Sequence, residues 1–205
     1  MAVIKPTYDL ETAHAHAGPV AGIDEAGRGP WAGPVVAAAV ILDPDDIPDG
    51  LADSKKLSET RREKIALSIR ERALVSVGVA SVEEIDEINI LQATFLAMAR
   101  AEEGLADRPA TCIVDGSQKP KLKAATQMVV KGDATSLSIA AASIIAKTVR
   151  DDMMRALALD HPFYAWEKNK GYGAPAHREG LARYGVTPHH RKSFAPIHKI
   201  LCENA

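Results

Sequence analysis

The chain has few aromatic residues and few cysteines. Phe, Trp and Tyr together make up 4% of its 205 residues, so its core must be largely aliphatic. Its two cysteines, Cys112 and Cys202, lie far apart, and neither belongs to a Cys-x-x-Cys pair, which argues against a structural zinc site. Cys112 sits inside an apolar run, where we expect it to be a small buried hydrophobic residue.

Other signals are missing as well. No apolar run is long enough to span a membrane, and there is no signal-peptide pattern. We therefore expect a cytoplasmic protein with no membrane partner. The phosphate-binding sequence Gly-x-x-x-x-Gly-Lys-Ser/Thr does not occur, which argues strongly against a phosphate-loop nucleotide hydrolase. A net charge of −2 does not indicate a general binder of polyanions.

Positive charge is nevertheless gathered in three clusters. They are Lys55, Lys56, Arg61, Arg62 and Lys64; Lys119, Lys121 and Lys123; and His189, His190, Arg191 and Lys192. Taken singly, each cluster is best interpreted as a solvated face. Beside an acidic site, three clusters favour a local track for a phosphate backbone.

The patterning predicts a mixed α/β protein with a five-stranded sheet. Hydrophobic residues make up 46% of the chain, enough for one ordinary domain. We expect strands over residues 20–23, 35–42, 74–80, 110–114 and 127–130, and helices over residues 58–73, 81–104, 135–159 and 175–184. Ser58, Ser81 and either Thr135 or Ser136 are the expected helix caps. Residues 1–17 are weakly patterned and expected to be loosely ordered, residues 18–160 form the main domain, and residues 161–205 form a C-terminal helical extension.

Four carboxylates follow three of the expected strands. Asp24 and Glu25 end the first, Asp115 ends the fourth, and Asp133 follows the fifth. If these strands are neighbours, the carboxylates converge and raise one another's pKa values. Mg²⁺ or Mn²⁺ would relieve that repulsion, and two such ions can hydrolyse a phosphodiester. The arrangement indicates a metal-dependent nuclease, although each carboxylate alone could be ordinary turn chemistry and Asp133 could cap the following helix.

Six stretches of the chain carry a family resemblance. Residues 22–30, Gly-Ile-Asp-Glu-Ala-Gly-Arg-Gly-Pro, resemble the signature of type 2 ribonuclease H, also called ribonuclease HII. Five further stretches agree in order and spacing: 53–58; 114–116; 131–133 followed by 139–147; 171–173 with His177; and 190–194. Together they extend the resemblance over residues 20–199.

The resemblance implies a ribonuclease H-like fold and an endonuclease that cuts RNA in RNA–DNA hybrids and at single ribonucleotides in duplex DNA. It implies that Asp24, Glu25, Asp115 and Asp133 hold two Mg²⁺ or Mn²⁺ ions and that the products carry 3′-hydroxyl and 5′-phosphate ends. The implied role is removal of ribonucleotides and RNA primers from DNA. The implied partner is a hybrid or ribonucleotide-containing duplex, bound by a monomer.

The same resemblance assigns the substrate contacts. The loop Gly27-Arg28-Gly29, together with Tyr172, is expected to sense the 2′-hydroxyl, the group that separates ribose from deoxyribose. Lys55 and Lys56 are expected to touch phosphate, and Arg191 to lie under the duplex. Without the resemblance these residues would be interpreted as surface charges and, for Tyr172, as a packed aromatic. We expect His177 to be structural.

Two other functions remain open from the residues alone. A resolvase or a transposase-type enzyme also uses clustered carboxylates, but the glycine-rich loop and Gly171-Tyr172-Gly173 favour ribose sensing. A non-catalytic nucleic-acid-binding module would present four acidic residues to a polyanion, which argues against that alternative. Nicking of a duplex that carries one ribonucleotide separates all three.

Overall fold

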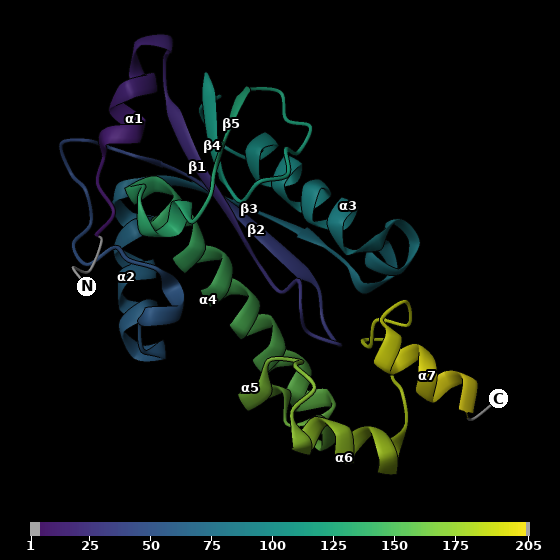
Figure 1. Cartoon of the computed structure of the whole chain (residues 1–205). Helices are drawn as coiled ribbons and strands as arrows, with labels where there is room; N and C mark the ends of the chain where they lie inside the picture. The colour runs from purple at the N-terminus through teal and green to yellow at the C-terminus, as the bar shows by residue number, and fades with distance from the viewer. Residues whose placement is uncertain (1–4, 204–205) are drawn as a thin grey trace.

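A mixed five-stranded sheet forms the centre of the protein. The computed structural model describes residues 5–203 (Figure 1). The strands are β1 (Val20–Ala26), β2 (Val35–Leu42), β3 (Ala73–Ala80), β4 (Thr111–Asp115) and β5 (Ala125–Val129), in the order β3-β2-β1-β4-β5. β1 is antiparallel to β2 and parallel to β4, while β4 and β5 are parallel. The predicted five-stranded mixed sheet is therefore confirmed.

Helices cover both faces of this sheet, which explains why β2 is an unbroken apolar run. α3 (Val82–Glu103) packs on one face, and α2 (Glu59–Arg72) and α4 (Leu137–Asp160) pack on the other (Figure 1). α4 lies very close to β1 at Gly22. A Cβ atom on Gly22 would lie 2.2 Å from the main-chain carbon of Ser138, so only glycine allows this contact.

Helices α2, α3 and α4 begin where the sequence predicts. Ser58 accepts a hydrogen bond from the Arg61 amide, Ser81 and Glu84 form a capping box, and Ser136 accepts one from the Ile139 amide. The expected helix over residues 81–104 is interrupted, because Asn89 has a φ of 67°. Its side-chain oxygen accepts from the amides of Leu91 and Gln92, so it caps the second half of α3.

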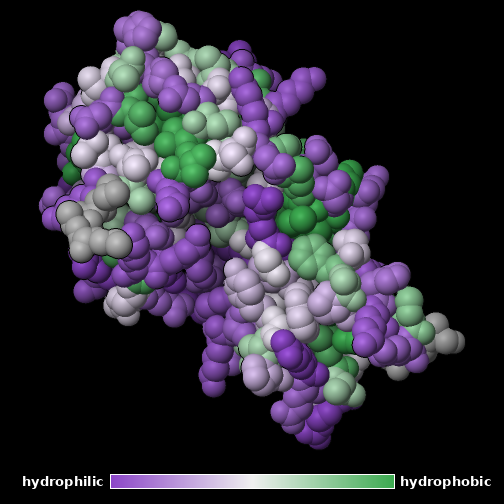
Figure 2. All heavy atoms as spheres, in the orientation of Figure 1, coloured by the Kyte–Doolittle hydropathy of each residue, from purple (hydrophilic) through white to green (hydrophobic). Residues whose placement is uncertain are grey.

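The C-terminal extension packs around the far end of α4. It contains α5 (Trp166–Asn169), α6 (Pro175–Tyr184) and α7 (Ala195–Glu203) (Figure 1). Several of the chain's few aromatic residues gather here, with Tyr164 and Trp166 stacked at a centroid distance of 5.0 Å. Figure 2 shows a largely hydrophilic face that is hollowed between the sheet-bearing body and these helices.

The N-terminal segment corrects an expectation. Residues 1–17 were expected to be loosely ordered, and residues 1–4 lie outside the described part of the chain. In the rest, α1 (Asp9–His14) packs against the start of α4. The fully buried Glu11 carboxylate accepts hydrogen bonds from the Ser136 hydroxyl at 2.6 Å and the Ser138 amide at 2.8 Å. The weak apolar pattern misled because the hydrogen bonds of one buried carboxylate, in addition to the packing of Tyr8 and Leu10, fix this segment.

The structure also bears on membrane association. Among residues 5–203, no helix has the length and apolar character needed to cross a lipid bilayer.

Candidate active site

Asp24 and Glu25 lie on the last part of β1, which pairs with β2 but no longer with β4. β1 continues to Ala26 beside β2, beyond the predicted end at residue 23, but its pairing with β4 ends at Ile23 and Val114. Asp24 shares a sheet face with Gly22 and so lies under α4, where it is 6% exposed. Its Oδ1 accepts a hydrogen bond from the Glu25 amide at 2.7 Å. Glu25 forms an ion pair with Arg28 at 3.4 Å.

Asp115 and Asp133 come to the same edge from β4 and from the turn that leads into α4. Asp133 lies in the 3-10 turn Gly132–Ala134, directly before that helix. Asp115 Oδ1 accepts a hydrogen bond from the Gly132 amide at 2.6 Å, which joins the two segments. A Cβ atom on Gly132 would lie 2.5 Å from Ile139 Cδ1 and 3.3 Å from the Asp115 oxygen. Glycine at this position therefore lets the turn carrying Asp133 approach Asp115.

The electrostatics show that these carboxylates interact. Burial is the largest cause of the raised pKa of Asp24, followed by the charges of Glu25 and Asp115. Burial also raises the pKa of Glu25; Arg28 opposes that shift and Asp115 adds to it. The pKa of Asp133 is raised by burial and then by Asp53 and Asp115. Asp115 is thus a charged neighbour of the other three.

The residues fit a hard divalent cation in their chemistry. All four supply carboxylate oxygens, the ligands that Mg²⁺ and Mn²⁺ prefer, and a cation would offset their repulsion. Within residues 5–203, however, no three Asp, Glu, His or Cys side chains lie close enough together to form a ready-made metal site. Oxygens of Asp24, Glu25 and Asp115 instead accept hydrogen bonds from the protein itself.

A pocket of about 280 Å³ opens beside Glu25. Six of the residues predicted to act in catalysis or binding line it: Glu25, Gly27, Arg28, Gly29, Lys55 and Tyr172. The other wall residues are Ala26, Ser54, Ser143 and Lys147. Asp24, Asp115 and Asp133 are not part of its wall. We call the edge of the sheet with Asp24, Glu25, Asp115 and Asp133 the acidic edge. The structure places the glycine-rich loop, a lysine and a tyrosine around one of its carboxylates, Glu25.

Tyr172 faces the glycine-rich loop across this pocket. It is 53% exposed, and a Cβ atom on Gly29 would lie 3.3 Å from Tyr172 Cε1. The loop that carries Tyr172 is held on both sides: the Trp31 amide donates to the Gly171 carbonyl at 2.8 Å, and His177 Nδ1 lies 2.9 Å from the Tyr172 carbonyl. His177 is fully buried and hydrogen-bonded, as expected of a structural residue.

Lys55 and Lys56 lie in a short 3-10 turn, Ser54–Lys56, that Asp53 caps. A hydrogen bond of 2.8 Å between the hydroxyls of Ser54 and Ser143 fixes this turn to α4. Lys55 lines the pocket beside Glu25. Lys56 is exposed and lies 3.7 Å from Asp53, on a neighbouring pocket of about 430 Å³.

Arg191 corrects the prediction that it lies under the duplex. Its side chain is fully buried, so it cannot contact a phosphate backbone. It instead donates to the carbonyl oxygens of Gly27 and Arg28 at 2.6 and 3.0 Å, and to those of Gly33 and Pro34. The basic sequence around it resembles a solvated face, but the fold draws this one side chain inward to the glycine-rich loop.

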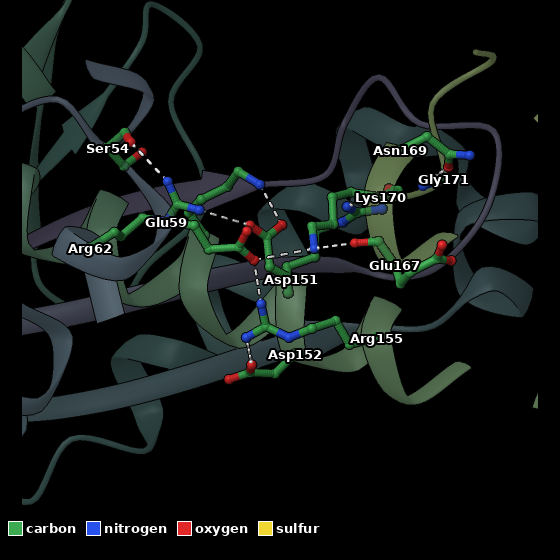
Figure 3. Close-up of polar contacts among 12 residues, drawn as sticks. Ser54, Glu59, Arg62, Asp151, Asp152, Arg155, Glu167, Asn169, Lys170 and Gly171 are labelled. Carbon is green, nitrogen blue, oxygen red and sulfur yellow. Dashed lines mark hydrogen bonds and ion pairs between the residues drawn. The ribbon is translucent and has the colours of Figure 1, made fainter. Parts of the chain in front are cut away.

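Sequence reasoning did not select Ser54, Ser143 or Lys147 as site residues. Lys147 bonds to the buried Asp151. Asp151 also accepts a hydrogen bond from Arg62 at 3.0 Å (Figure 3). Burial lowers the pKa of Lys147. A signal for these three residues was present, because they belong to the matched stretches 53–58 and 139–147.

Comparison with known proteins gives one consistent result. The family model described as Ribonuclease HII matches residues 21–197. The chain is 58% identical over 195 residues to a ribonuclease HII of Jannaschia sp. (strain CCS1), covering 95% of this chain and 98% of that protein. It is also 58% identical over 201 residues to a ribonuclease HII of Paracoccus denitrificans (strain Pd 1222), covering 97% and 96%. The crystal structure of ribonuclease H2 from Pyrococcus horikoshii OT3 superposes with a TM-score of 0.76 at 30% identity, covering 90% of this chain and 97% of that one.

Proposed function

The chain belongs to the ribonuclease HII family, enzymes that cleave RNA in RNA–DNA hybrids, and we propose that it also nicks duplex DNA at single embedded ribonucleotides. The observation that carries this proposal is the pocket shared by Glu25, the Gly27–Gly29 loop and Tyr172. It combines a carboxylate able to take part in hydrolysis with main-chain groups and an aromatic ring able to inspect a sugar.

The acidic edge supplies the catalytic groups. Asp24, Glu25, Asp115 and Asp133 would hold two Mg²⁺ or Mn²⁺ ions, which supply an activated water and stabilise charge on the leaving oxygen. Hydrolysis by such a water gives 3′-hydroxyl and 5′-phosphate ends. Hydrogen bonds from the amides of Glu25 and Gly132 orient Asp24 and Asp115. Burial of Asp24 keeps competing water away from its carboxylate.

Ribose recognition falls to the loop and to Tyr172. A protein distinguishes RNA from DNA at one site through the 2′-hydroxyl. Main-chain groups can approach a sugar closely where a residue has no side chain, and Gly27 and Gly29 provide such positions on the pocket wall. The half-exposed ring of Tyr172 offers a stacking surface beside them. Lys55 and Lys56 supply positive charge for the phosphates on either side.

The biological setting follows from this activity. The enzyme would remove ribonucleotides and RNA primers from DNA, acting as a monomer in the cytoplasm. Glu25, the glycine-rich loop and Tyr172 of one chain line the pocket together, so the proposed recognition needs no residue of a second copy.

The test uses three duplexes of one sequence: all DNA, DNA with one ribonucleotide, and an RNA–DNA hybrid. In Mg²⁺ we expect nicking of the second and third, with 3′-hydroxyl and 5′-phosphate ends, and no cleavage of the first. Cleavage of the all-DNA duplex would favour a resolvase-type or transposase-type enzyme. Binding without any nick would favour a non-catalytic module, and cyclic phosphate ends would rule out a water nucleophile.

A further inference from the structure

Two arginine side chains lie buried behind the glycine-rich loop. Arg150 on α4 is 2% exposed and Arg191 is fully buried. In the described part of the chain, their seven side-chain hydrogen bonds all go to main-chain carbonyl oxygens, and neither forms an ion pair with a carboxylate. Burial lowers the pKa of Arg150 to about 10 and that of Arg191 to about 9, so both stay charged at neutral pH. A pair of buried cations is costly, and these carbonyl groups, together with the Phe194 ring 5.0 Å from the Arg191 guanidinium, offset that cost.

The two arginines hold different parts of the region. Arg191 binds the Gly27 and Arg28 carbonyls at 2.6 and 3.0 Å. Arg150 binds the carbonyls of Ala32 and Lys170 at 3.1 and 2.9 Å. The Pro34 carbonyl accepts from both side chains. Only Arg191 therefore donates hydrogen bonds to carbonyls of the Gly27-Arg28-Gly29 sequence itself. Arg150 packs against Gly27 without such a bond: a Cβ atom on Gly27 would lie 2.4 Å from Arg150 Cδ.

These contacts determine what the loop presents to the pocket. The Gly27 carbonyl and the Arg28 amide belong to one planar peptide group, as do the Arg28 carbonyl and the Gly29 amide. In a trans peptide the N–H points opposite to the C=O. Carbonyls turned inward to Arg191 therefore turn the two amides away from it. Within residues 5–203 neither amide donates to another protein group, which leaves both available to a ligand.

When a charged group donates a hydrogen bond to a peptide carbonyl, the amide of the same peptide group becomes a stronger hydrogen-bond donor. Hydrogen bonds in a chain polarise one another, and a charged member strengthens the effect in a site of low dielectric constant. The Arg28 and Gly29 amides thus become stronger donors than ordinary peptide groups. Such donors suit the oxygen atoms of a ribose or of its neighbouring phosphate.

We propose that Arg191 is a positioning residue that sets ribose discrimination, by orienting and polarising the Arg28 and Gly29 amides from behind the loop. The proposal rests on the ribose-sensing role proposed above for this loop. Arg191 does not touch substrate. A lysine cannot replace it, because a single ammonium group lacks the planar fork that reaches both carbonyls.

Arg191→Lys and Arg150→Lys form a matched pair. Both replace a buried guanidinium by an ammonium in the same region, and both should lower the melting temperature. Discrimination is measured in an Asp115→Asn background with Mg²⁺, as the ratio of dissociation constants for an all-DNA duplex and for the same duplex carrying one ribonucleotide. We expect Arg191→Lys to reduce that ratio about five- to tenfold, the change that loss of one hydrogen bond worth about 1 to 1.4 kcal/mol produces. Arg150→Lys should change it by less than about twofold, because Arg150 donates to no carbonyl of the loop sequence and lysine keeps the Cδ methylene that packs on Gly27.

A second readout does not depend on substrate. The amide proton resonances of Arg28 and Gly29 should move upfield in Arg191→Lys and stay near their original positions in Arg150→Lys. Equal loss of discrimination in both variants, or unchanged resonances in Arg191→Lys, would overturn the proposal. If the parent protein showed no preference for the ribonucleotide, the function proposed for the loop would be wrong, while the resonances would still report whether Arg191 polarises it.

Discussion

Individual carboxylates at the acidic edge carry opposite consequences for stability and for activity. Asp24 has a raised pKa because it is buried beside Glu25 and Asp115. A carboxyl group whose pKa is higher in the folded state stabilises the fold at low pH, and this contribution is lost as the pH rises through the folded pKa. At neutral pH without a cation, the charged Asp24 carboxylate therefore lowers the stability of the fold. The same carboxylate is expected to be required for activity.

The variant Asp24→Asn tests both consequences. Asparagine keeps an acceptor for the Glu25 amide but removes the charge. Turnover in Mg²⁺ should fall about a thousandfold, since loss of metal-assisted stabilisation costs several kcal/mol. Without divalent ions the variant should unfold at higher urea than wild type at pH 7, and the difference should vanish below about pH 4, near the pKa of an unfolded aspartate. Asp107→Asn, an exposed carboxylate in a loop, should change neither property.

Tyr172 allows a second prediction at this scale. Its ring lies half-exposed against Gly29, so the ring face is the part offered to substrate. Tyr172→Phe should keep most activity on a duplex with one ribonucleotide, whereas Tyr172→Ala should lose about one to two decades of kcat/KM through lost stacking. The loss should be smaller on a long hybrid, where many 2′-hydroxyls guide the enzyme. If Phe were as poor as Ala, the phenolic hydroxyl would be essential; an Ala variant as active as wild type would make Tyr172 a packing residue.

The sequence predicted these residues to different degrees. Asp24 and Asp115 were accessible because each follows an apolar run, and parallel neighbouring strands bring such ends together. Arg191 was not, because nothing in a basic stretch distinguishes the side chain that turns inward. Only the tertiary fold shows that carbonyl oxygens of the Gly27–Pro34 region surround it.

Secondary-structure elements were predicted well where local chemistry defines them. Ser58, Ser81 and Ser136 cap helices through their own hydroxyls, and these signals lie within a few residues. The interruption at Asn89 and the order of α1 were missed. α1 is six residues long and is fixed by contacts with α4 more than a hundred residues away. No local periodicity can report such a contact.

Mutation can test whether the contact between α1 and the start of α4 stabilises the protein. Glu11→Ala removes two hydrogen bonds from the start of α4 and should lower the free energy of unfolding by about 2 to 4 kcal/mol. Activity should also fall, because the Ser136 amide bonds to the Gly132 carbonyl in the turn that carries Asp133. Urea unfolding and kcat measure the two effects. Asp9→Ala, an exposed carboxylate on the same helix, should change stability by less than about 0.5 kcal/mol; an equal loss there would mean that helix charge, not the Glu11 contact, is responsible.

On the scale of the whole molecule, the site depends on the C-terminal extension. Polar contacts link α2 and α4 to residues 167–171. Lys170 lies 3.4 Å from Glu59 on α2 (Figure 3). Arg150 on α4 donates to the Lys170 carbonyl. His190, within the extension, bonds to His177 at 3.0 Å, and His177 in turn contacts the Tyr172 carbonyl. The family resemblance predicted the extension, but not that buried histidines connect it to the tyrosine loop.

The hydrogen bonds of these histidines define their protonation. The Thr187 amide donates to His190 Nδ1, so His190 carries its proton on Nε2 and donates to His177 Nε2. His177 then carries its proton on Nδ1 and donates to the Tyr172 carbonyl. Both rings are neutral in this arrangement. Burial, and for His190 also the neighbouring His177, His189 and His161, lowers their pKa values, that of His190 to about 3.

Acid should therefore lower the free energy of unfolding of the protein, because the buried histidines His177 and His190 are neutral in the fold. An unfolded histidine gains its proton near pH 6.5 and folded His190 only near pH 3, so the stability is fully present above about pH 6.5 and is lost as the pH falls toward 3. The expected slope for one such histidine is about 1.36 kcal/mol per pH unit within that window. Urea unfolding between pH 5 and pH 7.5, the range in which histidines titrate, should show that His190→Gln is less stable than wild type at pH 7.5 but loses less with acid. His198→Gln, on the exposed surface of α7, should retain the wild-type slope. A wild-type slope in His190→Gln would mean that other groups, and not this buried pair, cause the loss of stability in acid.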